Sequence, residues 1–212
     1  MLKICYTVLF SNYENLKEPS IISEGWRFVC LTDQPLKSDV WEIKQMPLIG
    51  SPQRTARYYK ILFHKVFNEQ FTLYVDASFK INIDLNIWWE RFRSPITVIQ
   101  HPERSCVYEE AKSCITFNRG NSYQIRKQIE RYRKLRIPAN TYLIQSGILM
   151  RERTPDVIDF CERWHEELSK SSSRDQIAFV YCAIQKPVHH TIQFNYVNSR
   201  EFQYTKHFKH RK

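Results

Sequence analysis

Short apolar segments alternate with amphipathic segments along most of this chain, and this alternation limits its possible folds more than any other feature. Runs rich in β-branched and aromatic residues predict strands at residues 3–10, 26–31, 40–44, 71–75, 79–83, 96–99 and 143–150. Apolar spacing typical of helices falls at residues 52–67, 86–92, 107–117, 122–135, 155–168 and 173–184. The alternation predicts an α/β fold, a single domain over residues 1–212 with a mostly parallel, twisted sheet and helices on both faces.

Glycine is scarce, with four residues in the whole chain, Gly25, Gly50, Gly120 and Gly147. Neither G-x-G-x-x-G nor G-x-x-x-x-G-K-[ST] can be written with them. This excludes P-loop NTPases, dinucleotide-binding Rossmann enzymes and kinases with a Gly-rich loop, because each needs glycine where backbone approaches phosphate. A phosphate bound by this chain would be held by side chains or by a metal ion.

The chain is basic, since 32 Lys and Arg against 22 Asp and Glu give a net charge of +10. A balance of this kind favours an anionic partner, such as nucleic acid, an anionic membrane or a phosphorylated small molecule. The alternative is a basic surface without a specific partner.

Apolar runs and cysteine spacing indicate a cytoplasmic protein with no transmembrane segment. The longest unbroken apolar run, residues 177–184, is far shorter than a membrane span. The N-terminus lacks the features of a signal peptide. The six cysteines are too far apart for a C-x-x-C pair, and several lie in apolar runs, so we expect small buried side chains in a reducing compartment.

Polar residues follow several of the predicted strands. Ligands of parallel α/β sheets bind beyond the carboxyl ends of the strands. Each of these residues is also common in turns, but as a group they predict a ligand site. The strand ends carry Ser11 and Asn12, Thr32 and Asp33, Asp76 to Ser78, and His101.

The helix that begins at Pro52 carries Arg57, Lys60 and His64 on one face. We interpret this face as a clamp for a diphosphate, because arginine can contact phosphate through two parallel hydrogen bonds. The alternative is a solvated basic stripe. Asp76, at the end of a buried strand, can face a divalent metal, whereas Ser78 in the second position of a D-x-D-like pair is a weak ligand.

Five motifs in order resemble nucleotide-sugar glycosyltransferases of the GT-A fold. They are R-x-x-K-x-x-x-H (residues 57–64), YVDAS (74–78), HPER-x-x-x-YEEA (101–111), QSGILMR (145–151) and SRDQIAF (173–179). Within that fold the chain resembles a glycosyltransferase-like group first catalogued in plants and bacteria as a domain of unknown function, over roughly residues 1–185. Its size and basic tail are similar to the N-terminal domain of a large chlorella-virus glycosyltransferase. That similarity implies a piece of a longer polypeptide in a virus-infected host cell.

The resemblance implies a UDP-sugar donor, a divalent cation (Mn²⁺, or Mg²⁺) and an acceptor hydroxyl on a glycan or glycoprotein. It assigns metal binding to Asp76, Ser78 and a late histidine, His207 or His210. The residues that it assigns to the donor are Thr7, Phe10, Ser11, Thr32, Asp33, Arg57, Lys60, Asp76, Ala77, Ser78, Gln145, Ser146 and Gly147.

The resemblance also makes Asp175 the general base of an inverting enzyme. The alternative is a carboxylate that stabilises the positive end of its helix. Ser173 and Gln176 are spaced as a capping box, so we expect Asp175 to be free of capping and to point outward.

A second candidate function is a non-catalytic, basic nucleic-acid-binding module whose aromatic residues stack on bases. The residues that favour it crowd one helix, namely Arg126, Lys127, Arg131, Arg133, Lys134 and Arg136. The same helix face could be solvated, or could bind an anionic glycan or membrane. No nucleic-acid-binding motif is present, so nucleic acid is the less favoured partner. Nothing in the sequence indicates an oligomeric state.

Overall fold

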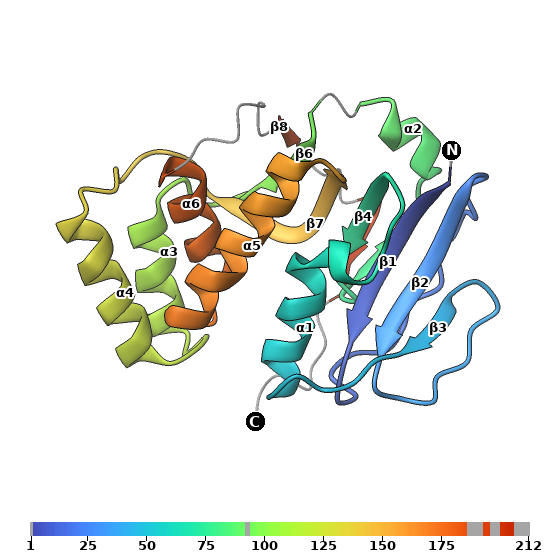
Figure 1. Cartoon of the computed structure of the whole chain (residues 1–212), viewed down its shortest axis with the longest axis horizontal. Coiled ribbons are helices and arrows are strands. Elements are labelled where there is room, and N and C mark those ends of the chain that lie inside the picture. Colours follow the sequence, from blue (N-terminus) through green and yellow to red (C-terminus); the bar gives the residue numbers. More distant parts are fainter. Residues whose placement is uncertain (1, 92–93, 186–192, 196–199, 206–212) are drawn as a thin grey trace.

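The structure, a computed structural model, describes residues 2–91, 94–185, 193–195 and 200–205. Its centre is a seven-stranded sheet of order β3-β2-β1-β4-β7-β6-β8 (Figure 1). These strands are β1 (Lys3–Leu9), β2 (Trp26–Thr32), β3 (Glu42–Gln45), β4 (Phe71–Val75), β6 (Ile96–Gln100), β7 (Ile144–Glu152) and β8 (Gln193–Asn195). A separate two-stranded sheet pairs β5 (Phe79–Ile81) with β9 (Phe202–Tyr204).

The predicted α/β fold with a mostly parallel sheet is confirmed, and β7 is the exception. β1 pairs parallel with β2 and β4, β2 with β3, and β6 with β8, whereas β7 runs antiparallel to β4 and β6. Because β7 runs antiparallel to β4 and β6, it starts at the edge of the sheet where these two strands end. The first residues of β7 therefore lie beside the end of β4.

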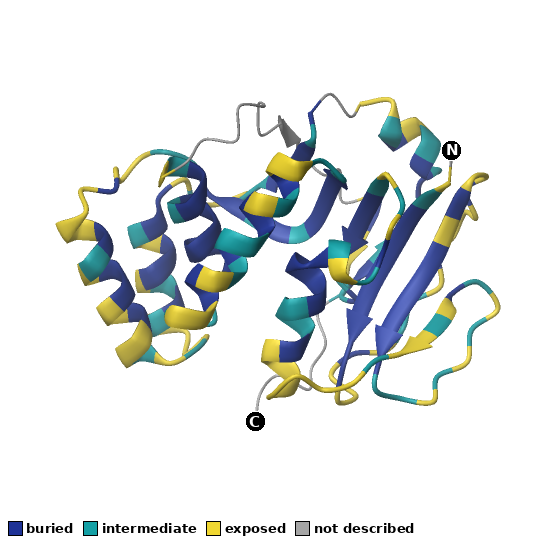
Figure 2. Ribbon diagram, viewed as in Figure 1, coloured by how far each residue is buried: buried dark blue, intermediate teal, exposed yellow. Residues whose placement is uncertain are grey.

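Both faces of the sheet are buried, as the unbroken apolar strand runs require (Figure 2). On one face Ile4, Tyr6 and Val8 of β1 share a core with α1 (Pro52–Ile61), α5 (Pro155–Lys170) and α6 (Asp175–Gln185). On the other face Cys5 and Leu9 join a core with the short α2 (Leu85–Trp89) and the β5–β9 sheet. The second face thus has less helical cover than the first.

A third core packs α3 (Val107–Thr116) and α4 (Ser122–Lys134) against α6, on the side away from β1 to β3 (Figure 1).

On the basic face of α4, Arg131 is ion-paired with Glu167 of α5 and Lys134 with Glu130. This face is therefore partly engaged within the molecule.

All six cysteines lie in the described part of the chain, buried and unpaired, as expected. Among the described residues, no helix combines the length and the apolar character that crossing a membrane requires.

The first helix is shorter than the sequence predicts. α1 ends at Ile61 and is followed by a 3₁₀ turn, Phe63–Lys65. The buried Arg151 donates from Nη1 to the carbonyl oxygens of Lys60 (2.9 Å) and Ile61 (3.1 Å). The hydroxyl of Tyr6 donates to the same Lys60 carbonyl at 2.7 Å. These donors satisfy carbonyls that a continuing helix would otherwise bond, so the helix can end here.

Replacing Arg151 tests whether its hydrogen bonds stabilise the end of α1. Arg151→Met should lower the free energy of unfolding by about 3 kcal/mol or more, because buried carbonyls lose a charged donor. The exposed Arg126 on α4 is the matched control, and Arg126→Met should change stability by no more than about 0.5 kcal/mol. Urea denaturation measures both variants. Equal denaturation midpoints would show that Arg151 does not stabilise the end of α1.

Candidate functional site

A cavity of about 580 Å³ opens at the carboxyl ends of β1 and β4. Many of the residues predicted from the sequence meet in its wall, although they come from β1, α1, β4, β7 and α6. These are Phe10, Ser11, Arg57, Lys60, Asp76, Ala77, Ser146 and Asp175. The wall of this cavity is the candidate functional site.

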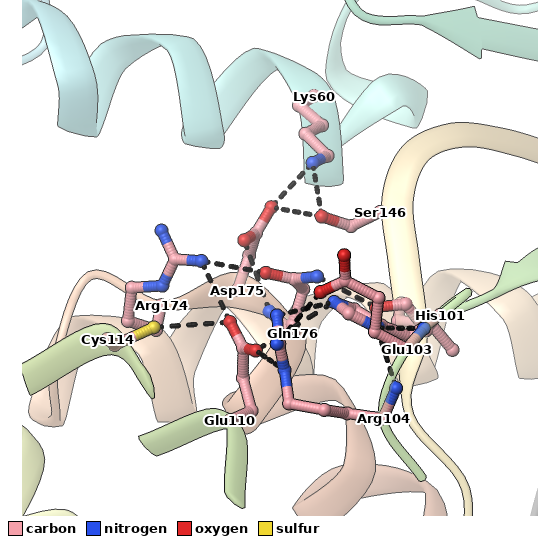
Figure 3. A network of polar contacts seen from close by, with 11 residues as sticks. Lys60, His101, Glu103, Arg104, Glu110, Cys114, Ser146, Arg174, Asp175 and Gln176 are labelled. Carbon is pink, nitrogen blue, oxygen red and sulfur yellow. Dashed lines mark hydrogen bonds and ion pairs between the residues drawn. The ribbon is translucent and has the colours of Figure 1, made fainter. Parts of the chain in front are cut away.

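A buried ion pair lies in this wall. Lys60 Nζ is 2.5 Å from Asp175 Oδ2 and 2.9 Å from Ser146 Oγ, and the Ser146 hydroxyl donates to the same carboxylate oxygen at 2.9 Å (Figure 3). Lys60 is 6% exposed and Asp175 is 5% exposed. Lys60 therefore joins the cavity wall, and the alternative of a solvated stripe is wrong at this position. His64 of the same predicted face contacts Glu162 of α5 instead, at 2.9 Å.

The expected outward orientation of Asp175 is wrong. Burial by itself raises the pKa of this carboxyl, but the positive charges of Lys60, Arg57 and Arg174 outweigh it and hold the pKa well below its usual range. Asp175 is therefore ionised throughout the physiological pH range. α6 begins at Asp175, and the Gln176 side chain donates to the Ile144 carbonyl at 2.9 Å and accepts from Arg174 at 2.8 Å, which is not the arrangement of a capping box.

An irregularity in β7 turns Ser146 toward the cavity. Val98 of β6 pairs with Leu149, whereas the next residue, Ile99, pairs with Gln145, so residues 146–148 have no partner in β6. Bulges of this kind re-aim side chains and are frequent beside active sites.

Gly147 and Gln145 are not in the cavity wall. A Cβ atom on Gly147 would lie 2.7 Å from Cε2 of Phe79. The Gly147 carbonyl accepts a hydrogen bond from the amide of Asp76 at 2.7 Å. Gly147 is thus a close-packing residue that positions Asp76, rather than part of the predicted sugar pocket.

The segment that follows β1 forms a turn with left-handed backbone angles, and it contacts the segment that follows β2. Ser11 and Asn12 have φ angles of 56° and 52°, which side-chain-bearing residues seldom adopt. Asp33 accepts a hydrogen bond from the Ser11 amide at 2.9 Å and so supports this turn from outside the cavity. Thr7 and Thr32 are buried outside the cavity wall, and the Thr32 hydroxyl accepts from the Gln34 amide. These three residues do not line the cavity as predicted.

Asp76, the predicted metal ligand, lies in the cavity wall. Its Oδ1 accepts from the amide (3.1 Å) and hydroxyl (3.0 Å) of Ser78. The described part of the chain contains no cluster of three or more His, Cys, Asp or Glu suited to a metal, and His207 and His210 lie outside the described residues. One carboxylate fits a Mg²⁺-like cation that keeps several waters and takes further ligands from substrate phosphates.

The wall residues that sequence reasoning missed include Tyr13, Tyr74, Arg174 and Gln176. Arg174 joins two motifs, because its Nη2 is 3.1 Å from Glu110 Oε1 while Arg104 Nε is 2.8 Å from Glu110 Oε2. HPER, YEEA and SRDQ thus meet in one ionic network behind Asp175 (Figure 3). The feature of the sequence that could have identified Arg174 as a wall residue is its position directly before Asp175.

The chain is similar to a plant protein in sequence and to a mouse protein in fold. It is 24% identical over 140 residues to "Probable hexosyltransferase MUCI70" of Arabidopsis thaliana, which covers 60% of this chain and 24% of the relative. The chain therefore spans about a quarter of that relative's length. Its fold is similar to that of mouse xyloside xylosyltransferase 1 in the apo form, with a TM-score of 0.55 and 9% identity over 93% of this chain and 86% of that chain.

Residues 37–210, most of the chain, match a family of glycosyltransferase-like domains. The match includes α1, β4, β7 and α6, which carry Lys60, Asp76, Ser146 and Asp175. The chain belongs to the TOD1/MUCI70 glycosyltransferase-like domain family.

Proposed function

We propose that this protein transfers a sugar from a UDP-sugar donor to a hydroxyl group of a glycan or glycoprotein acceptor, with a divalent cation bound at Asp76. The observation that carries the proposal is the meeting of Asp76, Lys60 and Asp175 in one cavity. Glycosyl transfer needs the charge of the leaving diphosphate neutralised, and a carboxylate near the reacting carbon.

The cavity offers different surfaces to the parts of such a donor. Phe10, stacked on Tyr59 with ring centroids 5.6 Å apart, forms an apolar wall for a base. Arg57 and Lys60 supply cationic donors for the diphosphate. Mn²⁺ or Mg²⁺, when bound, would neutralise phosphate charge, and Asp76 would hold it with Ser78 fixing the carboxylate. Because one carboxylate gives a weak site, the cation should bind together with the nucleotide.

Lys60 links donor binding to the catalytic carboxylate. Its ammonium group pairs with Asp175 in the structure described here. A diphosphate that draws this ammonium group to itself removes the largest charge that lowers the Asp175 pKa. The pKa then rises, and the carboxylate becomes a better acceptor for the proton of the attacking hydroxyl in an inverting transfer.

The nucleic-acid module is the second candidate. Arg131 and Lys134 of α4 are already ion-paired within the chain, which reduces the charge available to nucleic acid. A phosphate-backbone partner would bind with a steep salt dependence, whereas a nucleotide sugar with its cation would respond to a chelator. The similarity to the chlorella-virus enzyme, and with it a cytoplasmic place in an infected cell, stays a prediction.

The first prediction concerns the cation. UDP with Mn²⁺ should raise the melting temperature, and UDP in EDTA or Mn²⁺ alone should raise it much less, because the cation and diphosphate complete one site. Asp76→Asn should abolish the difference between UDP with Mn²⁺ and UDP in EDTA. Asp39→Asn, at an exposed position, is the control and should behave as wild type. An equal shift with UDP in Mn²⁺ and in EDTA would contradict the metal role of Asp76.

The second prediction concerns the phosphate contact. Arg57→Ala should weaken UDP binding by about tenfold or more, because a charge-assisted hydrogen bond contributes roughly 1.5–3 kcal/mol. Uridine binding should be almost unchanged, since uridine carries no phosphate. Calorimetric titration with both ligands checks this. A uridine affinity that falls as far as the UDP affinity would indicate that Arg57 shapes the cavity without contacting phosphate.

The third prediction concerns Asp175. Asp175→Asn should lower stability by about 3–5 kcal/mol, because it leaves the Lys60 ammonium buried without its partner. The folded fraction should bind UDP at least as well as wild type, since Lys60 is freed for phosphate. Sugar transfer to a glycan acceptor, followed as UDP release, should fall by at least ~10²-fold.

Ser146→Ala is the control for Asp175→Asn, because it removes one hydrogen bond to the same carboxylate but keeps both charges. Its transfer rate should stay within about tenfold of wild type. An Asp175→Asn variant that is folded, binds UDP and keeps its transfer rate would rule out the proposed base.

A further inference from the structure

A second cavity of about 430 Å³ lies next to the first. Its wall combines the first turn of α1, the start of α4, the last turns of α5 and the segment that follows α5. Both cavities are lined by Ser51, Gln53 and Arg57. A molecule in the second cavity would therefore lie across the first turns of α1 from the proposed donor site.

The two cavities differ in charge. The first is lined by the carboxylates of Asp76 and Asp175 together with the cationic groups of Arg57, Lys60 and Arg174. The second, as far as its described lining shows, has Arg54 and Arg57 and neither Asp nor Glu. Arg57 Nη1 donates to the Gln53 carbonyl at 3.2 Å, and its buried Nε has no hydrogen-bond partner in the described structure. Arg57 thus retains donor capacity for a ligand.

The helix ends at this cavity also favour an anion. Ser51 and Asn121 line it and are the N-caps of α1 and α4. Neither helix has an acidic residue in its first turn, and Arg54 occupies that turn of α1. A positive side chain near the positive end of a helix is unfavourable, and a bound anion relieves it.

The remaining wall suits a ligand rich in hydroxyl groups. It presents serine hydroxyls, the amide groups of Gln53 and Gln124, and the rings of Tyr58 and His165, which contact edge to face at 5.3 Å. Burial lowers the pKa of His165, which favours the neutral imidazole, and this form can both donate and accept hydrogen bonds. Hydroxyls and amides have the same dual capacity.

We propose that the second cavity binds the acceptor, and that this acceptor is a saccharide whose anionic group contacts Arg54 and Arg57. The shared wall would place the bound saccharide next to the donor. This inference rests on the proposed function, because it takes the first cavity as the donor site.

The test compares three trisaccharides that differ at C6 alone. Cellotriose is neutral, its C6-oxidised counterpart carries carboxylates, and its C6-sulfated counterpart carries sulfates. Calorimetric titration measures their affinity for the full chain, with and without saturating UDP and Mn²⁺. We expect one or both anionic trimers to bind at least about tenfold more tightly than cellotriose, also when UDP is bound. Tighter binding of the carboxylated or of the sulfated trimer identifies the anionic group that the acceptor carries.

Variants separate this inference from the proposed function. Arg54 lines the second cavity alone, so Arg54→Ala should weaken the anionic trimer by about tenfold and leave UDP affinity unchanged. Arg126→Ala, on the exposed part of α4, is the control and should change neither. Equal affinities for all three trimers, no binding at millimolar concentration, or an anionic trimer unaffected by Arg54→Ala would overturn the acceptor assignment. Failure of UDP to bind would instead overturn the donor site.

Discussion

The geometry of the site depends on the buried guanidinium of Arg151. This residue of β7 contacts the last carbonyls of α1, and its Nη2 lies 2.5 Å from the Tyr6 hydroxyl of β1. Its guanidinium also lies over the Phe63 ring, 4.5 Å from the centroid. These contacts join two strands and a helix that are distant in sequence. They also fix the backbone of Lys60, so the same charge stabilises the fold and directs the ammonium group into the cavity.

Alternating charges continue from that point through the site. Lys60 faces Asp175, and Arg174 beside it contacts Glu110, which in turn contacts Arg104. Burial raises the Glu110 pKa, but a hydrogen bond from Cys114 and the two arginines outweigh this and lower it. Each buried charge in this series therefore has a partner of opposite charge, which offsets the cost of removing it from water. Of the motifs in the second half of the chain, HPER-x-x-x-YEEA supports the cavity from behind, whereas QSGILMR and SRDQIAF contribute residues to its wall.

The sequence was sufficient for β1 to β7 and for the edge where the parallel strands end, but it did not predict β8 or β9. β1 and β4 are buried on both faces, so their apolar runs are unambiguous, and parallel α/β sheets bind ligands at one edge. The features that could not be predicted from the sequence depend on contacts between residues that are distant along the chain. The end of α1 depends on Arg151, and the inward turn of Asp175 depends on Lys60. Thr7 is different, since its neighbours Tyr6 and Val8 face α1, and strand alternation alone would have placed it on the opposite face.

Arg57 lines both cavities, so two molecules that both contact it would bind with affinities that depend on each other. A molecule that draws the guanidinium toward one side changes the surface offered on the other. Thermodynamic linkage then requires reciprocity: whatever factor the first molecule imposes on the affinity of the second, the second imposes on the first. If the first cavity binds the nucleotide and the second the saccharide, as proposed, a single side chain on the first helix would thus set how strongly each of them favours or opposes the binding of the other.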